Sequence, residues 1–465
     1  MGLQKFDLVV IGSGPAGEKG AVQAAYFGKK VALIEKGPAV GGACVHTGTL
    51  PSKTLREAAL YVTGFQKREL YGMSLEIDRD ASLRQLMGRL KAVTELQVAQ
   101  IGGNLDRHGV TTLKGHARFV NANEVVVEQN GLEIARLSSQ AFLIAVGSSP
   151  HRPPGVPFSD SDVEDSDTIL DLDRIPSSLA VVGGGVIGCE YACMFGALGT
   201  KITIIEGRDA LMGFLDREIS AALRTSIERG HHEILFGDAV SSIQRIPGGP
   251  LEITLGSGRI LNVDKVLYSA GRAGNTSGLG LDAAGVACDP RGRIPVNEHF
   301  QTSQPHIYAA GDVVGAPALA SVSMEQGRVG VCHAFGFDYK TKVSSIVPYG
   351  VYTIPEISMV GATEEELNKA GIRFVAGRAR YEGNARGQII GDRDGLLKLL
   401  FEVPSKKLLG VHIIGERATE MVHTAQMVME FGGTIDVFIN SVFNFPTLSE
   451  AFKYAAYDGL GRMSK

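Results

Sequence analysis

The sequence is poor in several residue types, and each shortage narrows what the protein can be. It has no tryptophan and no apolar run near the roughly 18 residues that a membrane-spanning helix needs, so no membrane protein is predicted. The first apolar strand follows Met1 almost at once, which leaves no room for a secretory signal. Basic residues are not in excess, because the net charge is -4 and the pI is near 6.3, so no nucleic-acid partner is expected.

Cysteine is also scarce, with only five residues in the whole chain. None of them has a CxxC or similar spacing, so the sequence predicts no metal site. Cys189 and Cys193 are one helical turn apart on an apolar segment and are expected to be buried thiols. The odd count, together with the absence of a signal, predicts reduced thiols and a cytoplasmic protein. The five residues are Cys44, Cys189, Cys193, Cys288 and Cys332.

Glycine, in contrast, is abundant, with 59 residues, and some of them mark an internal repeat. In the first copy an expected strand, Leu8–Ile11, runs into Gly12-Ser-Gly-Pro-Ala-Gly17. An expected helix over 18–27 and a second strand over 30–34 follow, and the strand ends at Glu35. A chain of 465 residues with 44% hydrophobic and 21% charged residues is typical of a globular protein with roughly three domains.

The second copy repeats this pattern further along the chain. The strand Leu179–Val182 runs into Gly183-Gly-Gly-Val-Ile-Gly188, a helix extends to Leu198, and the strand 201–205 ends at Glu206. In both copies the carboxylate follows the first glycine by 23 residues (35 − 12 and 206 − 183). One such glycine motif is weak evidence, whereas two copies in the same context favour two dinucleotide-binding units.

Each residue type in the motif has a physical reason in nucleotide binding. The first glycine (Gly12, Gly183) permits the tight turn, the second (Gly14, Gly185) lets backbone approach a pyrophosphate, and the third (Gly17, Gly188) lets helix pack on strand. The N-terminus of the helix presents free N–H groups to the phosphates. The carboxylates of Glu35 and Glu206 are placed to accept hydrogen bonds from a ribose.

Both units also close in the same way. The expected strand Ala141–Ala145 leads to Gly147, and the expected strand Lys265–Ser269 leads to Gly271, where small residues let the chain pass close to a bound cofactor. The first unit is longer and contains an insertion with an amphipathic helix over 81–108.

Further motifs make the chain resemble the pyridine nucleotide–disulfide oxidoreductase family from the first strand to the C-terminus. They are Gly41-Gly-Ala-Cys44, Pro51-Ser-Lys53, Gly115-His-Ala117, Gly183 to Glu190, Ala270-Gly-Arg272, Ile307-Tyr-Ala-Ala-Gly-Asp312, Tyr352-Thr-Ile-Pro-Glu356 and Phe445-Pro-Thr447. The resemblance implies an α/β fold with two Rossmann-like dinucleotide-binding domains and a C-terminal α+β dimerisation domain. It implies an FAD domain over 1–150 and 275–345, an NAD(P) domain over 151–274, and an interface domain over 346–465 that makes a homodimer or a larger homo-oligomer.

The resemblance also implies which residues bind the nucleotides. A helix that begins near Leu319 is expected to direct its N-terminus at the flavin, and Asp312 is expected to hold the ribityl chain. The residues implied for FAD are Gly12, Gly14, Pro15, Gly17, Glu35, Lys36, Gly42, Cys44, Thr49, Lys53, Ala117, Gly147, Asp312 and Ala320. Those implied for NAD or NADP are Gly183, Gly185, Val186, Gly188, Glu206, Arg208, Val240 and Gly271.

Two departures from the family pattern decide the predicted function. Disulfide reductases of the family carry two cysteines beside the flavin, but here the partner of Cys44 is Thr49, which cannot form a disulfide. Those relatives also carry a His-Pro-Thr motif whose histidine is an acid/base group, and here Phe445 stands in its place. Glu450, which orients that histidine in relatives, remains without a histidine to orient.

Both losses fall on the thiol half of the reaction, so electrons from the flavin need another acceptor. The branch of the family that moves hydride from NADPH to NAD⁺ through FAD, by a ping-pong mechanism, resembles this chain in both departures. Lys53 and Glu190 are predicted to form an ion pair that tunes the flavin. The alternatives are an NAD(P)H:quinone or dye reductase, and a redox-sensing binding protein in which nucleotides control association.

Nucleotide selectivity and the remaining polar groups leave several interpretations open. Glu206 suits a free ribose hydroxyl and repels a 2′-phosphate, whereas Arg208 can either approach that phosphate or lie in solvent. Cys44 and His46 are interpreted as retained scaffold, with a redox thiol and a proton donor as the respective alternatives.

Overall fold

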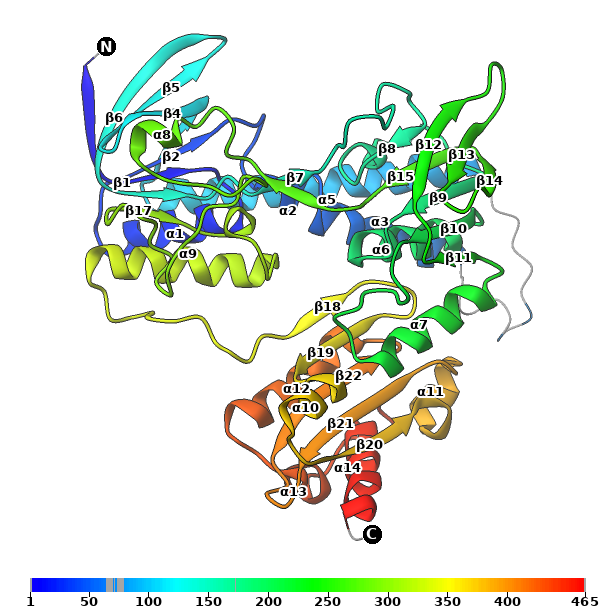
Figure 1. Cartoon of the computed structure of the whole chain (residues 1–465). Helices are drawn as coiled ribbons and strands as arrows, with labels where there is room; N and C mark the ends of the chain where they lie inside the picture. The colour runs from blue at the N-terminus through cyan, green and yellow to red at the C-terminus, as the bar shows by residue number, and fades with distance from the viewer. Residues whose placement is uncertain (1, 64–69, 71, 73–78, 172, 464–465) are drawn as a thin grey trace.

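The computed structural model describes residues 2–63, 70, 72, 79–171 and 173–463, and within them the chain is built around three large β-sheets (Figure 1). The first sheet is formed mainly by the N-terminal third of the chain, the second by its middle, and the third by its C-terminal part. None of the described helices is both long and apolar enough to span a membrane.

The first sheet has the order β3-β2-β1-β6-β5-β4, and β17 also pairs with β6. Strands β3, β2, β1, β6 and β17 run parallel, while β4 and β5 extend the sheet as antiparallel strands. The bounds are β1 (Leu3–Ile11), β2 (Val31–Glu35), β3 (Thr111–Lys114), β4 (His116–Asn121), β5 (Glu124–Gln129), β6 (Leu132–Ile144) and β17 (Ile307–Ala309).

Strand β1 shows why this sheet is buried on both faces. Leu8 and Val10 pack on one face with residues of α1 (Pro15–Tyr26) and α9 (Ala320–Phe335), the two helices that lie side by side in Figure 1. Val9 and Ile11 pack on the other face. A continuous apolar run is what a parallel strand covered on both sides requires.

The second sheet is wholly parallel, with the order β11-β10-β9-β15-β8. Its strands are β8 (Val163–Glu164), β9 (Ser178–Val182), β10 (Lys201–Glu206), β11 (Glu233–Phe236) and β15 (Lys265–Tyr268), with helices α6 (Val186–Ala197) and α7 (Arg217–Arg229). A small antiparallel sheet consists of β12 (Val240–Arg245), β13 (Leu251–Leu255) and β14 (Ile260–Val263). The chain passes between the first two sheets through the antiparallel pair β7 (Ser148–Pro150) and β16 (Arg272–Gly274).

The third sheet is antiparallel, with the order β18-β19-β22-β21-β20. Its strands are β18 (Tyr349–Val351), β19 (Ile357–Gly361), β20 (Phe374–Arg380), β21 (Leu396–Glu402) and β22 (Leu408–Ile414). The helices of this part are α10 (Glu364–Ala370), α11 (Ala385–Ile390), α12 (Ala418–Glu430), α13 (Ile435–Asn440) and α14 (Glu450–Met463). Residues of α12, α13 and α14 share one apolar core with the sheet.

The remaining elements connect these sheets. Helices α2 (Gly42–His46), α3 (Thr49–Thr63) and α5 (Arg79–Arg107) follow β2, and α3 contacts both α5 and α6. The short elements are α8 (Leu281–Ala284) and the 3₁₀ helices η2 (Thr168–Leu170), η3 (Asp312–Val314) and η4 (Tyr381–Gly383). The predicted α/β class is confirmed, and so are the strands and helices predicted around both glycine turns and the helix predicted over 81–108.

Candidate functional site

A cavity of ≈ 940 Å³ opens where the first two sheets meet the third. This volume is in the range of ligand-binding sites. Its lining comes from the carboxyl ends of β1 and β2, from α2 and α3, from the start of α6 and α9, and from the 348–352 segment. Every residue implied for FAD lines the cavity except Gly17, and Glu190 and Val186 line it too.

The first and third glycines of each turn are required by the packing of the protein itself. Gly12 has a φ of 100°, and a Cβ atom there would lie 2.4 Å from the carbonyl oxygen of Ala145. A Cβ atom at Gly17 would lie 1.9 Å from the carbonyl oxygen of Gly12, and one at Gly188 would lie 2.0 Å from that of Gly183. Gly17 therefore serves close packing of helix on strand.

The middle glycines are different, because internal packing does not require them. Gly14 and Gly185 have ordinary extended backbone, with φ of -64° and -80°. A Cβ atom at Gly14 would come no closer than 3.9 Å to Gly42, and one at Gly185 would meet no atom within 4 Å. The free space at the start of α1 and α6 is the space that a pyrophosphate needs.

The two repeat carboxylates accept hydrogen bonds from their glycine turns and, for Glu35, from the chain that follows it. Glu35 accepts hydrogen bonds from Ser13 N (2.9 Å), Ser13 Oγ (2.5 Å) and Gly37 N (2.6 Å). Glu206 accepts one from Gly184 N at 2.7 Å. Both side chains are thereby oriented at the end of their strand, the position from which a carboxylate reaches a ribose.

Arg208 does not lie free in solvent, since it pairs with Glu206. Its Nε and Nη2 atoms lie 2.9 and 3.1 Å from the carboxylate oxygens, although the Arg208 side chain is 63% exposed. Burial opposes ionisation of Glu206, but the hydrogen bonds from Arg208 and Gly184 lower its pKa overall. Glu206, Arg208, Gly183, Gly185, Gly188, Val240 and Gly271 lie outside the lining of the cavity, and only Val186 of this set belongs to it.

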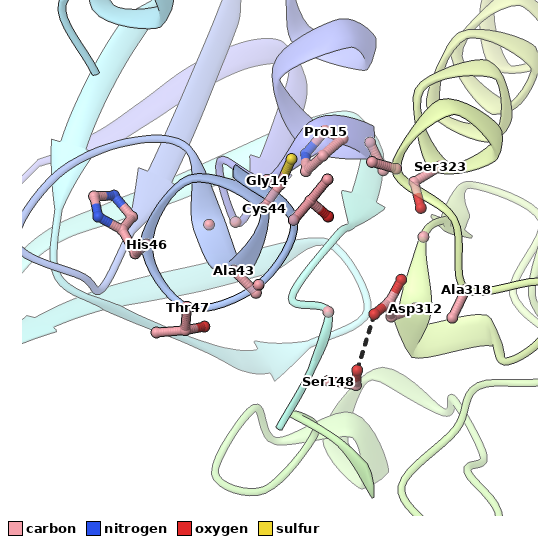
Figure 2. A pocket seen from close by; sticks show the side chains of 18 of the residues that line it. Gly14, Pro15, Ala43, Cys44, His46, Thr47, Ser148, Asp312, Ala318 and Ser323 are labelled. Carbon is pink, nitrogen blue, oxygen red and sulfur yellow. Dashed lines mark hydrogen bonds between the residues drawn. The ribbon is translucent and has the colours of Figure 1, made fainter. Parts of the chain in front are cut away.

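A polar relay reaches Asp312 from the second unit. Arg272 donates from Nε to Ser148 Oγ (2.9 Å) and from Nη2 to the carbonyl oxygen of Ser148 (2.7 Å). Ser148 Oγ in turn donates to Asp312 Oδ2 at 3.0 Å, as Figure 2 shows. Because the hydroxyl accepts from Arg272, its single proton is directed at Asp312.

The predicted ion pair between Lys53 and Glu190 is present in the cavity wall. Lys53 Nζ lies 2.6 Å from Glu190 Oε2, although the two residues are 137 positions apart. Glu190 is buried, so it is not a surface residue of α6. Its other oxygen, Oε1, accepts a hydrogen bond from the backbone N–H of Tyr352 at 2.9 Å.

No described cysteine other than Cys44 lines the cavity, and none of the five cysteines forms a disulfide. Burial raises the pKa of Cys44, and a hydrogen bond with Thr49 only partly offsets this. His46 Nε2 lies 3.0 Å from the carbonyl oxygen of Val40. Phe445 lies outside the cavity lining and is 74% exposed.

Sequence reasoning missed several residues of this cavity. Ser13, which holds Glu35, stands inside the first glycine turn, and Arg272 stands in the quoted Ala-Gly-Arg motif. Tyr352 belongs to the Tyr-Thr-Ile-Pro-Glu motif, but the sequence did not predict its contact with Glu190. Asp167 had no sequence signal; burial raises its pKa, and it lies 3.9 Å from Arg272.

Two family models match the chain. The model described as pyridine nucleotide-disulphide oxidoreductase matches residues 6–327, and that of the dimerisation domain of the same group matches residues 347–456. The soluble pyridine nucleotide transhydrogenase of Mycobacterium bovis (strain BCG / Pasteur 1173P2) is 47% identical over 462 residues, which cover 99% of this chain and 98% of the relative. That of Vibrio parahaemolyticus is 41% identical over 461 residues, with 98% of each chain covered.

Solved structures show the same likeness. The HOCl-induced flavoprotein disulfide reductase RclA from Escherichia coli has a TM-score of 0.86 at 27% identity, with 96% of this chain and 98% of that chain covered. LpdA from Mycobacterium tuberculosis has a TM-score of 0.89 at 25% identity, with 97% and 99% covered. The likeness therefore extends over nearly the full length of all these chains.

Proposed function

Since the chain belongs to the pyridine nucleotide-disulphide oxidoreductase family, we propose that it transfers hydride between NADPH and NAD⁺ through bound FAD without a redox disulfide. The observation that carries the proposal is the pairing of Cys44 with Thr49 instead of a second cysteine. Relatives of 39–47% identity over almost the whole chain, which are called soluble pyridine nucleotide transhydrogenases, support it.

The family is FAD-dependent, and the cavity of this chain fits that cofactor. The open space at Gly14 and the N-terminus of α1 suit a pyrophosphate, and Glu35 suits the ribose. Asp312, oriented by Ser148, would hold the ribityl chain, and the start of α9 would favour negative charge on the ring. When bound, FAD supplies the capacity to accept and return a hydride.

The second glycine turn would hold the nicotinamide nucleotides, one after the other. Gly185 leaves room for a pyrophosphate at the start of α6. Glu206 suits the ribose of NAD(H), and Arg208 would leave Glu206 to meet the 2′-phosphate of NADP(H). Val186 and Glu190, which are on α6 and line the cavity, would orient the ring that reacts.

A homodimer or larger homo-oligomer is part of the proposal. The part of the chain that the dimerisation model matches carries several exposed large apolar side chains. They are Phe431, Val442, Phe445 and Tyr454. Exposed apolar groups of this kind are typical of an association surface. The domain limits at 150, 274 and 345, and a cytoplasmic location, remain predictions.

Anaerobic titration of the purified protein tests the proposed function. NADPH should bleach the flavin band at about one two-electron equivalent per subunit, and NAD⁺ should restore it completely. A requirement for about two equivalents would reveal a second redox centre and contradict the proposal.

Comparing quinone turnover with hydride transfer from NADPH to a thio-NAD⁺ analogue distinguishes the proposed function from that of a quinone or dye reductase. A transfer rate that is negligible beside the quinone rate would favour that alternative. Slow reduction of the flavin by either nucleotide, together with a change in assembly state, would favour the redox-sensing protein.

A further inference from the structure

We propose that the ring of Tyr352 is a positioning residue for the Lys53 ammonium group, so that the C-terminal part of the chain takes part in the redox centre. Lys53 Nζ lies 4.9 Å from the centroid of the Tyr352 ring. A lysine within about 6 Å of an aromatic ring centroid is attracted by the negative face of the ring. This inference rests on the proposed role of Lys53 beside FAD.

Three residues form a closed triangle of contacts in the cavity wall. Glu190 uses one carboxylate oxygen for Lys53 and the other for the backbone N–H of Tyr352. The Tyr352 ring in turn faces the ammonium group. Lys53 is on α3, Glu190 is on α6 and Tyr352 follows β18, so each corner comes from a different part of the fold. Glu190 and the Tyr352 ring thus hold Lys53 from two sides, and its ammonium group also donates a longer hydrogen bond to Ser52 Oγ on the same helix at 3.3 Å.

The segment that carries Tyr352 is itself firmly held. Arg56 on α3 is buried, donates from Nε to the carbonyl oxygen of Thr353 (3.0 Å), and lies 3.3 Å from Glu356. Thr419 on α12 donates from Oγ1 to Glu356 at 2.9 Å. The chain that follows Tyr352 is therefore held by contacts outside the triangle.

The ring restricts the direction of the Lys53 ammonium group, which the ion pair with Glu190 does not fix by itself. A lysine side chain has many rotamers, and a single carboxylate fixes the distance of its ammonium group more than its direction. A second attractive surface restricts the ammonium group to one position, which is the preorganisation that a site needs to stabilise charge. The cation–π contact does this without adding a second negative charge beside the flavin.

Two variants of Tyr352 separate the ring from the hydroxyl. Tyr352→Leu removes the ring and keeps the backbone N–H that donates to Glu190, whereas Tyr352→Phe keeps the ring and removes only the hydroxyl. The first readout is the rate at which Lys53 of the purified full-length protein is acylated, followed by mass spectrometry. Leu should raise this rate roughly two- to five-fold, the size of one cation–π contact at a partly exposed site, and Phe should not.

The second readout is the midpoint potential of the bound flavin together with steady-state kinetics. Tyr352→Leu should shift the potential to a more negative value and lower kcat, with the KM for either nucleotide changed less than about two-fold. Equal effects of Leu and Phe, or unchanged Lys53 labelling in the Leu variant, would overturn the proposal. The acylation of Lys53 can be measured whether or not the protein transfers hydride. A failure of the proposed function would therefore leave the test of the Tyr352–Lys53 contact intact.

Discussion

The Lys53 ammonium group and the Glu190 carboxylate lie 2.6 Å apart at the point where α3 meets α6. The pair joins the part of the fold built around the first sheet to the part built around the second. A fixed cation favours an electron-rich flavin, and the carboxylate keeps that cation in place. Both partners line the same cavity, but Lys53 is on α3 and Glu190 is on α6, the helix that follows the second glycine turn.

Removal of the charge at Lys53 tests this role. Lys53→Met should lower the rate of flavin reduction by NADPH by roughly a hundred-fold, the size expected when a preorganised electrostatic group is lost. Stopped-flow absorbance of the flavin measures that rate, and Lys53→Arg, which keeps the charge, should lose much less. If NADPH reduced the flavin of the Met variant at the wild-type rate, Lys53 would have no role in hydride transfer to the flavin.

The glycines of the second turn should respond in opposite ways to the same substitution. Gly185→Ala should leave the melting temperature almost unchanged, because its backbone is extended and the added Cβ atom meets nothing within 4 Å. It should nevertheless raise the KM for both nicotinamide nucleotides at least roughly ten-fold by obstructing the pyrophosphate.

Gly188→Ala is the matched control for that change. Its Cβ atom would lie 2.0 Å from the carbonyl oxygen of Gly183, so it should destabilise the protein by about 1–3 kcal/mol. Thermal unfolding and nucleotide kinetics of both variants check the pair. An unaltered KM in a well-folded Gly185→Ala protein would show that no pyrophosphate passes there.

Thr49→Cys should install the redox centre that the chain lacks. The Thr49 side chain is close enough to Cys44 to lower the pKa of its thiol, so a sulfur at position 49 would lie near the first one. Titration with NADPH should then require about two equivalents per subunit instead of one. Thr49→Ser, which adds no thiol, should stay at one equivalent.

The same Thr49→Cys protein should still fail to reduce disulfide substrates. Phe445 cannot transfer a proton, so the acid/base half of the thiol reaction remains absent. Turnover of lipoamide or glutathione by this single variant would show that another group supplies the proton.

The reactivity of Cys44 should depend on pH in a defined direction. Because burial raises the pKa of the thiol, less of it is thiolate at neutral pH than in an ordinary cysteine. Alkylation by iodoacetamide should therefore be slow near neutrality and should keep rising with pH beyond the range of an ordinary thiol. Exposed Cys288 is the internal reference, and faster labelling of Cys44 than of Cys288 at neutral pH would contradict this.

Arg208 should distinguish the two nicotinamide nucleotides. Arg208→Ala should raise the KM for NADPH roughly ten-fold through loss of the phosphate partner, and should change that for NADH little, since Glu206 remains. Arg259→Ala is the matched control, because Arg259 is also exposed, belongs to the same unit and pairs with a carboxylate, Glu233. An equal loss for both nucleotides would assign Arg208 to folding of the turn instead.

Most of the fold could be predicted from the sequence because its signals are local. The turns at Gly12 and Gly183 require residues without a Cβ atom, and the apolar strands before them require burial on both faces. The ion pair of Lys53 and Glu190 was predicted by resemblance and is present. The cavity also gathers nearly all the residues that the resemblance implied for FAD.

By itself the sequence determined the two glycine turns, the strands and helices beside them, and the replacement of a second cysteine by Thr49, because these depend only on neighbouring residues. Only the tertiary structure decided that Tyr352 faces Lys53, that Arg272 reaches Asp312 through Ser148, and that Arg208 pairs with Glu206. The contacts of Tyr352 and Arg272 join segments more than a hundred residues apart, and the Arg208 pair depends on a choice of rotamer. The long-range contacts and the Arg208 rotamer depend on how the folded chain packs, and a local sequence pattern does not predict that packing.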